Sequence, residues 1–433
     1  MEMALSNIID RLRANEVGFK QLILTADEVG INNNAGQQRQ QQQQQQQQPE
    51  QSAATEEQDG FNRATSKNIS ELVEAIESNH TVHSVFLDHF FIIKLSAEDV
   101  CLLFRALGSL PKLEQFSALS RQAEGWSIPM QAVVALMDGA KSLTSMRMTS
   151  IGLVGNENDF ESFAKALQGQ SCLKEFCLRG ACIVDGKIPL DGLLRTLSAI
   201  PKLEKIELTA MDLRQDLSGE WPTSPSSALR ICYCSSLKSL ELGGWVLDED
   251  LVLGMAKALE TNTSLRSLIM LDSNITNRGC IALSNMLAVN KTIERLDLSY
   301  NRISDAGAIA LAQSLIHNSS LKEIGLFGNF QVKSRAVFLH VIQYSNLALE
   351  DLLLDSQWDA EMNFYLNLNR MDRRRVLRNE KSLTRDDWLE ALVSVQDDKH
   401  NLCDADQDTL SYLFYFVMAQ PHFLVQSPLS SSG

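Results

Sequence analysis

Cysteines are the residues that most often carry metal or redox chemistry, and the chain has eight of them. Cys172, Cys177 and Cys182 follow one another at steps of five residues, and Cys232 and Cys234 are separated by a single residue. A structural zinc site needs two pairs of ligands, with roughly two to four residues between the members of a pair, and neither group provides them. We therefore expect free thiols that pack as small hydrophobic residues.

Two further segments resemble the start of a ligand-binding loop but lack residues that the chemistry requires. Asp404–Asp408 begins like a calcium loop, yet Thr409 occupies the position of the required glycine and Tyr415 that of the bidentate glutamate. Gly139–Ser142 lacks the Gly-Lys pair of a phosphate-binding loop. No set of serine, histidine and acidic residues stands out either. We predict that the protein is not an enzyme and holds neither a metal nor a cofactor.

The overall charge and the distribution of apolar residues limit the classes of partner. The formal net charge is -15, which repels nucleic-acid phosphates, and we predict no nucleic-acid partner. The basic run between Arg370 and Arg378 contains acidic residues and is typical of a solvated helix face. No apolar stretch is long enough to span a bilayer, and charges interrupt Met1–Lys20 where a signal peptide would need an apolar core. We expect a cytoplasmic protein, with the nucleus as the alternative, that is monomeric or weakly associating.

A repeated apolar pattern shows which elements must position any functional residue. The pattern L-x-x-L-x-L recurs every 28 residues, and an asparagine precedes each of these copies by three residues. The four clear copies begin at Leu265, Ile293, Leu321 and Leu349, after Asn262, Asn290, Asn318 and Asn346. Weaker copies begin at Phe19, Val82, Leu113, Leu143, Leu173, Leu203 and Leu237. The chain therefore contains eleven predicted strands.

Each repeat has a strand, a turn and a helix. Positions 1, 4 and 6 of the pattern are apolar and point to the core, while positions 2, 3, 5, 7 and 8 point away. The asparagine after the strand, as in Asn301 and Asn329, is expected to bond to the turn and to the neighbouring repeat. Helices are predicted over Thr276–Ala288 and Ser304–Ile316, with Thr276 and Ser304 as caps. Because one repeat cannot bury its own apolar face, the repeats must stack into an α/β solenoid, a horseshoe with a concave parallel sheet.

The segment Leu237–Leu354 resembles the ribonuclease-inhibitor-like class of leucine-rich repeats, and its letters LDLSYNRISDAGAIALAQSLI carry the likeness. The tail NFYLNLNRMDRRRVLRNEKSLTRDDWLEALVSV is similar to C-terminal extensions of diatom-type leucine-rich-repeat proteins. Members of the broader class inhibit ribonucleases, activate small GTPases, cap actin or sense ligands in immune receptors. The resemblance implies the fold and leaves the function open among these.

The domain organisation follows from where the pattern is interrupted. We predict a first repeat over 1–30, a disordered polyglutamine insert over 31–62, the solenoid over 63–356, a helical C-terminal cap over 357–425 and a flexible tail over 426–433. Helices are expected in the cap at 384–395 and 409–418. The segment 211–234, which is rich in proline and serine, is expected to be a surface loop.

The concave face is the predicted binding surface, since positions 5, 7 and 8 of the strands point away from the core. The C-terminal repeats place apolar and aromatic residues and one acid on this face: Ile269, Leu271, Asp297, Tyr300, Phe327 and Leu353. The N-terminal repeats place charged residues there: Arg147, Arg179, Glu207 and Glu241. Exposed aromatic groups surrounded by charges are typical of protein-binding hot spots. The structural alternatives are that the C-terminal extension covers these residues or that scattered apolar groups have no role.

The sequence thus predicts a scaffold or recognition protein that binds a protein partner on the concave face. One alternative is a GTPase-activating protein that donates Arg147 or Arg179 to the active site of its partner. The resemblance implies such an arginine in an early repeat, although the chain lacks the highly acidic tail of those relatives. The other alternative is an enzyme inhibitor whose acidic surface blocks a basic target.

Overall fold

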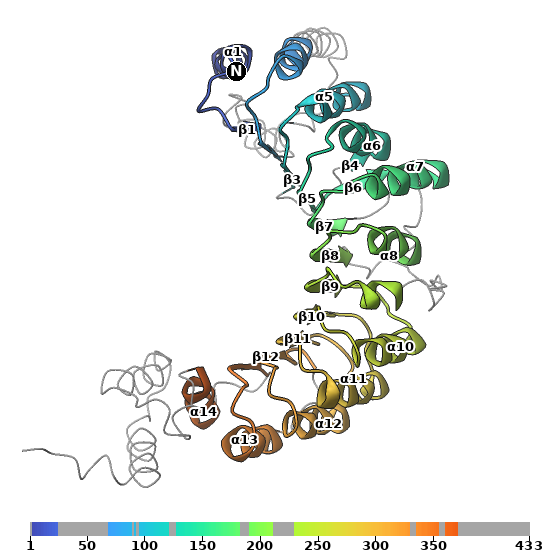
Figure 1. Cartoon of the computed structure of the whole chain (residues 1–433), viewed down its shortest axis with the longest axis vertical. Helices are drawn as coiled ribbons and strands as arrows, with labels where there is room; N and C mark the ends of the chain where they lie inside the picture. The colour runs from blue at the N-terminus through green and yellow to red at the C-terminus, as the bar shows by residue number, and fades with distance from the viewer. Residues whose placement is uncertain are drawn as a thin grey trace, which may run out of the picture. The chain divides into compact units, whose positions relative to one another are not determined.

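The computed structural model describes residues 2–24, 68–88, 91, 95–120, 127–181, 190–210, 229–329, 335–354 and 360–370. Eleven strands form one sheet and follow one another in chain order, and helices alternate with them, which confirms the predicted α/β leucine-rich-repeat solenoid. The chain divides into two compact units, Met1–Asn274 and Ile275–Gly433. In each unit the helices lie on one side of the strands (Figure 1). We call the other side of the sheet the open face.

The first unit contains eight strands of the main sheet, and neighbouring strands pair in parallel. These strands are β1 Gln21–Leu24, β2 Ser84–Asp88, β3 Gln115–Leu119, β5 Ser145–Thr149, β7 Glu175–Ala181, β8 Lys205–Ala210, β9 Ser239–Gly243 and β10 Ser267–Ile269. The helices are α1 Glu2–Arg13, residues 68–77, α5 Ala97–Ser109, α6 Met130–Gly139, α7 Glu157–Gln168, α8 Leu190–Ser198, the 3₁₀ helix η1 Leu229–Tyr233 and α10 Glu249–Leu259. A second, two-stranded sheet pairs β4 Ser127–Pro129 with β6 Gly152–Val154.

The second unit continues the same alternation with shorter strands. Its strands are β11 Arg295–Asp297, β12 Glu323–Gly325 and β13 Asp351–Leu353, which pair in parallel. Its helices are α11 Asn277–Val289, α12 Asp305–Leu315, α13 Arg335–Tyr344 and α14 Ala360–Arg370. The leucines and isoleucines at positions 1, 4 and 6 of the β11 and β12 repeats, such as Ile293, Leu296 and Leu298, are buried against the helices, whereas Leu352 and Leu354 of the last repeat are half-buried. Burying this apolar surface is the main driving force for stacking one repeat on the next.

The asparagines that precede the strands form a ladder of buried hydrogen bonds. The side-chain oxygen of Asn318 accepts from the backbone N–H groups of Ser320 and Leu321, at 2.9 and 2.8 Å. Its amide donates to the carbonyls of Leu287 and Asn290, at 2.7 and 3.1 Å. The other rungs bond in the same way around Asn79, Asn262, Asn290 and Asn346. Each of these asparagines therefore forms hydrogen bonds to the backbone at the start of its own strand, and most also bond to the backbone near the end of the helix one repeat earlier.

The residue three positions after the end of the L-x-x-L-x-L pattern forms a hydrogen bond to the preceding repeat, as predicted for the asparagines. This residue donates to a carbonyl of the preceding strand although its type changes: Trp245 donates to Leu208 at 2.9 Å, Ser273 to Leu242 at 3.0 Å and Asn329 to Leu298 at 3.0 Å. An indole, a hydroxyl and a carboxamide thus donate to equivalent backbone carbonyls of different repeats.

Three local expectations change in the structure. Thr276 caps α11 through a bond from the N–H of Arg278, but the Ser304 side chain makes no cap hydrogen bond to α12. Asn277 of the neighbouring repeat accepts from the N–H groups of Ser304 and Gly307 instead. The predicted loop 211–234 ends in the helix η1, with Ile231 buried, because this apolar residue packs into the core. Helix α14 lies within the segment predicted as a helical cap, although the sequence analysis placed the helices of this cap at 384–395 and 409–418.

The polyglutamine insert, the flexible tail and the helices predicted over 384–395 and 409–418 lie outside the described residues. At the end of the described chain, the amide of Asn369 in α14 donates to the carbonyls of Asn346 and Leu349, at 3.3 and 2.8 Å. Met362 and Leu366 of α14 are buried, and the hydroxyl of Tyr365 accepts from Gln343 of α13 at 2.8 Å. This helix therefore packs on the last repeat and extends the asparagine ladder.

Candidate functional site

The four charged candidates of the first unit lie on the open face and are engaged in ion pairs. Nη2 of Arg179 lies 3.2 Å from Oε1 of Glu241 and 3.4 Å from Oε2 of Glu207. The second oxygen of Glu207 contacts Nζ of Lys205 at 2.6 Å. Arg147 is separate from this group, and its Nη2 lies 2.6 Å from Glu175. Sequence reasoning identified the candidate residues, but it did not identify the partners that neutralise them.

The pKa shifts on this face follow from the same contacts. The hydrogen bond to Glu175 raises the pKa of the Arg147 guanidinium further. Burial alone would raise the pKa of Glu207, but hydrogen bonds from Lys205 and Cys177 and nearby positive charges lower it overall. Burial and the bond to Glu207 raise the pKa of the Cys177 thiol to about 12. Glu207 therefore stays ionised and the Cys177 thiol stays protonated near neutral pH, so Cys177 has none of the thiolate character of a reactive cysteine.

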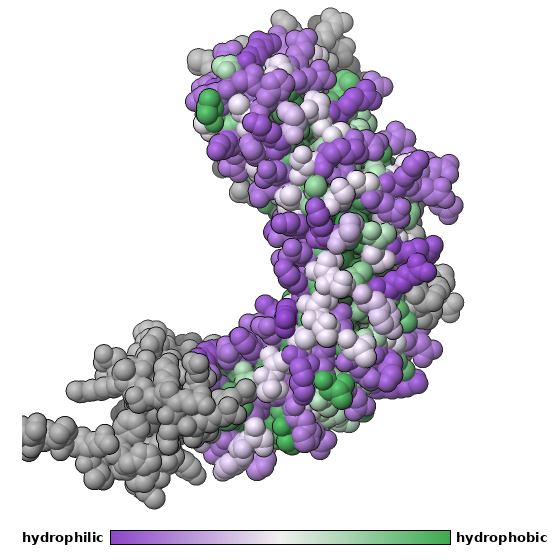
Figure 2. Space-filling model, in the orientation of Figure 1, coloured by the Kyte–Doolittle hydropathy of each residue, from purple (hydrophilic) through white to green (hydrophobic). Residues whose placement is uncertain are grey.

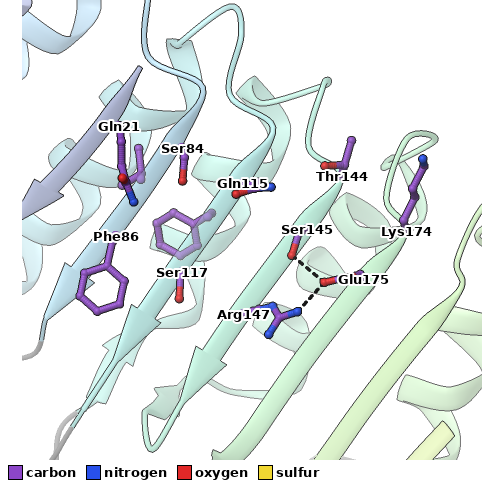
Figure 3. A pocket seen from close by; sticks show the side chains of 12 residues that line it. Gln21, Ser84, Phe86, Gln115, Ser117, Thr144, Ser145, Arg147, Lys174 and Glu175 are labelled. Atoms are coloured by element: carbon purple, nitrogen blue, oxygen red, sulfur yellow. Dashed lines mark hydrogen bonds and ion pairs between the residues drawn. The ribbon is translucent and has the colours of Figure 1, made fainter. Parts of the chain in front are cut away.

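A polar hollow of about 470 Å³ lies on the open face over β1 to β7 (Figure 3). Its floor is a row of residues at position 3 of successive strands, Gln21, Ser84, Gln115 and Ser145, which are neighbours in the sheet. Phe86 points into the open space in Figure 3, and Arg147 and Glu175 bound the hollow on one side. Ser145 donates to Glu175 at 3.2 Å, so this carboxylate is held by two groups. The sequence analysis placed Arg147 on this face but did not identify the hollow, because its floor consists of neutral glutamines and serines.

The second unit brings together an aromatic pair that is exposed on the open face. Tyr300 and Phe327 have 54% and 45% of their surface exposed, and their ring centroids lie 5.4 Å apart at 76°, an edge-to-face contact. Leu353, on the neighbouring strand β13, is 49% exposed. These three residues and Asp297 form what we call the aromatic patch. Ile269 and Leu271 belong to the first unit, where both are half-buried.

Tyr300 adopts a backbone conformation that is unfavourable for an aromatic residue. Its φ is +58°, and the equivalent residues of other repeats that also have positive φ are Ser150, Gly244, Asp272 and Gly328. Glycine tolerates this left-handed region at no steric cost, whereas a residue with a Cβ loses about 1 kcal/mol or more. Gly328 is required next to the ring, since a Cβ added there would lie 2.5 Å from Cδ1 of Tyr300. The turn thus accepts strain to present this side chain.

Asp297 lies beside the aromatic pair and is 93% buried, with only 7% of its surface exposed. Its Oδ1 accepts from the backbone N–H and the hydroxyl of Ser299, at 3.0 and 2.6 Å. Its carboxylate occupies the space that a side chain at Gly325 would fill, and a Cβ there would lie 2.1 Å from Oδ1. The absence of a side chain on β12 therefore lets this acid lie flat across the sheet.

Metal sites and membrane spans are two further kinds of functional feature. No group of three or more His, Cys, Asp or Glu residues in the described ranges could hold a metal ion. No helix among the described elements is long and apolar enough to cross a membrane. Figure 2 shows that hydrophilic residues cover most of the visible surface of the first unit, with hydrophobic residues scattered among them. The aromatic patch and the polar hollow are therefore the two surface features that remain to be explained.

Comparison with known proteins agrees with the repeat architecture. A family model described as a leucine-rich repeat matches residues 261–284 and 289–312. Among solved structures, the actin-binding site 2 of leiomodin-1 is 19% identical, with 38% of this chain and 96% of that chain covered and a TM-score of 0.33. The C-terminal domain of tropomodulin from Caenorhabditis elegans is 15% identical, with 37% and 100% covered and a TM-score of 0.33. No curated protein is similar enough in sequence to count as a relative. The chain has the leucine-rich-repeat fold, and the family model matches two of its segments.

Proposed function

We propose that the protein is a non-catalytic recognition protein that binds a protein partner on the open face of its sheet, at the aromatic patch. The observation that carries this proposal is the strained and exposed Tyr300. Residues held in sparsely populated backbone regions cluster at binding sites, because a structure has no other reason to retain the strain. The other residues with positive φ at this position are glycine, aspartate and serine, so Tyr300 is the one aromatic residue held in this conformation among the residues that the structure describes.

The composition of the aromatic patch supports the same conclusion. Tyrosine is enriched in the hot spots of protein interfaces, where aromatic residues contribute much contact area with few rotatable bonds. The edge-to-face contact fixes Tyr300 against Phe327, so little side-chain entropy remains to be lost on binding. Leu353 adds exposed apolar surface on the neighbouring strand. A rigid apolar centre on a surface with charged neighbours fits a protein partner better than a small polar ligand.

The test is quantitative affinity purification of the full chain from its own cells, with three baits compared. These are the wild type, the double variant Tyr300→Ala and Phe327→Ala, and a control with Tyr344→Ala. Tyr344 lies at the end of α13 and is 68% exposed, so the control removes an equally exposed tyrosine from a helix. We expect at least one specific partner to be lost only from the double variant. A set of partners that is the same for all three baits contradicts the proposal.

The GTPase-activating alternative has less support. An arginine that stabilises a phosphoryl-transfer transition state must reach the phosphates of its partner. Arg147 and Arg179 are both bound to carboxylates of neighbouring strands, and donating either would leave Glu175, or Glu207 and Glu241, without that contact. Single-turnover GTP hydrolysis with candidate small GTPases tests this alternative, and no acceleration is expected. The inhibitor alternative predicts binding that weakens steeply with ionic strength.

We also propose that residues 357–425 cap the open end of the solenoid, within the domain boundaries predicted from the sequence. The part of this segment that supports the proposal is α14, whose buried Met362 and Leu366 cover the last repeat. Terminal repeats need such a cover because their apolar face has no neighbour. Truncation after residue 356 should expose this face and cause aggregation, measured by light scattering. A truncated chain that stays monomeric and folded contradicts the capping role.

A further inference from the structure

Asp297 is a buried acid with no ionic partner among the residues that the structure describes. Its Oδ1 is held by two donors of Ser299. Its Oδ2 has no hydrogen-bond partner in the described ranges, and this atom is not among the side-chain atoms that are sealed from solvent. Two buried acids of the first unit, Glu207 and Glu241, differ from Asp297, since each contacts a basic side chain. One oxygen of Asp297 is therefore fixed by the fold, and the other is available on the open face.

The surroundings of Asp297 combine negative charge with aromatic surface. Positions 2, 3 and 5 of the three repeats that contain β11, β12 and β13 carry five acidic residues and two basic ones. Both basic residues already have acidic partners, Arg295 with Glu323 at 3.4 Å and Lys322 with Glu294 and Glu350 at 3.9 and 4.0 Å. Within the described part of this unit the excess charge of the face is negative, and the exposed rings of the aromatic patch stand directly beside it.

An unpaired carboxylate with little solvent contact is costly, and structures normally pair it or neutralise it. A cation that approaches Oδ2 would gain a charge-assisted hydrogen bond without further desolvation of the acid. A guanidinium or ammonium group also binds favourably over the face of an aromatic ring, and its aliphatic stem packs against apolar side chains. The aromatic patch offers all three partners to one side chain: a carboxylate oxygen, two rings and a leucine.

We propose that the aromatic patch binds a basic side chain, arginine or lysine, of the partner protein, with Asp297 as the carboxylate that receives its charge. This inference rests on the proposed function and specifies its chemistry. The partner segment is expected to place the basic residue over Tyr300 and Phe327, with its charged end at Oδ2 of Asp297. Ser299 acts as a positioning residue, since its two hydrogen bonds fix the orientation of the carboxylate.

The experiment uses a displayed library of random dodecapeptides selected on the immobilised full-length chain. Peptides that also bind the variant Tyr300→Ala and Phe327→Ala are removed by counter-selection, so that the survivors depend on the rings. The Kd of each surviving peptide is then measured with the wild type, with Asp297→Asn and with the control Asp351→Asn. The control removes the same charge from strand β13, where Asp351 already faces Arg370 at 3.9 Å. Each peptide is also synthesised with its basic residue replaced by a neutral isostere, citrulline for arginine or norleucine for lysine.

We expect a basic residue in the surviving peptides and at least a tenfold weaker Kd with Asp297→Asn, against less than threefold with Asp351→Asn. The neutral peptide should bind the wild type and Asp297→Asn with the same Kd, because the change in the peptide and the change in the protein remove the same interaction. The change in the peptide leaves the fold of the protein untouched, so this comparison holds even if Asp297→Asn destabilises the chain. Peptides that need the rings but ignore Asp297 overturn this inference alone. A library without any ring-dependent peptide overturns the proposed function and the inference together.

Discussion

The asparagine ladder makes a quantitative prediction at Asn318. The variant Asn318→Ala removes four hydrogen bonds to the backbone, two accepted and two donated, and one accepted from the Ser320 hydroxyl, at a residue that is only 3% exposed. The two N–H groups and two carbonyls that remain belong to the backbone and cannot turn to other partners. A buried group left without its partner costs about 1 to 3 kcal/mol, and water that enters the space recovers part of this. We expect a loss of about 3 kcal/mol in the free energy of unfolding.

The assay is urea unfolding followed by far-UV circular dichroism, together with hydrogen exchange of the backbone amides in β11 and β12. Hydrogen exchange is needed because repeats unfold in part, and a single transition does not always report on all of them. The control is Ser319→Ala, an exposed neighbour whose change should stay within about 0.5 kcal/mol. The loss of protection against hydrogen exchange should be largest at the backbone amides of Ser320 and Leu321. A loss below about 1 kcal/mol, or equal losses in both variants, would refute the reasoning.

Three further variants or conditions test other features. Gly328→Ala should lower the free energy of unfolding by about 1 to 3 kcal/mol, because it adds a Cβ at positive φ and against the ring of Tyr300; an unchanged urea midpoint would show that the ring can move aside. The pKa of Glu207 is lowered in the fold, so its contribution to stability is full above the unfolded value of about 4.3 and is lost as the pH falls through the folded value. In Glu207→Gln the free energy of unfolding, measured by urea unfolding, should therefore fall less between neutral pH and pH 3 than it does in the wild type. An equal fall in the two proteins counts against the ion pairs of Glu207. Burial raises the pKa of the Cys280 thiol to about 12, so iodoacetamide at pH 8 should label it only after unfolding, as peptide mapping would reveal.

The sequence predicted the fold well because each repeat encodes the same physical requirement. Leucines at a fixed spacing can be buried only if the repeats stack, so all eleven strands were found from the apolar pattern, including β1 before the polyglutamine insert. Asn79 occupies a rung of the ladder that the sequence analysis overlooked, although it precedes Val82 by the same three residues. The signal was present there, but the weak apolar pattern around it hid the correspondence.

The site was less predictable because its properties depend on contacts between residues of different repeats. The sequence placed Arg179 on the open face, but only the structure shows that Glu207 and Glu241 bind it. Asp297 was expected as one charge among others, and its burial arises from the missing side chain at Gly325, one repeat away. The cap of α12 comes from Asn277 rather than Ser304 for the same reason. Spacing along the chain predicts which face of the sheet a residue is on, whereas its contact partners on other strands are known only from the structure.

The left-handed position after the strand has a consequence for how such a protein can change its specificity. Gly244, Asp272, Tyr300 and Gly328 follow one another at intervals of 28 residues and all have positive φ, so the turn keeps its geometry whichever side chain it carries. A substitution there alters the recognition surface without changing the length or register of the repeat. Evolution, or a protein engineer, could exchange contact groups at this position one repeat at a time, at a cost in stability of about 1 to 2 kcal/mol for a side chain larger than glycine, and of more at Gly328, where the Tyr300 ring occupies the space of a Cβ.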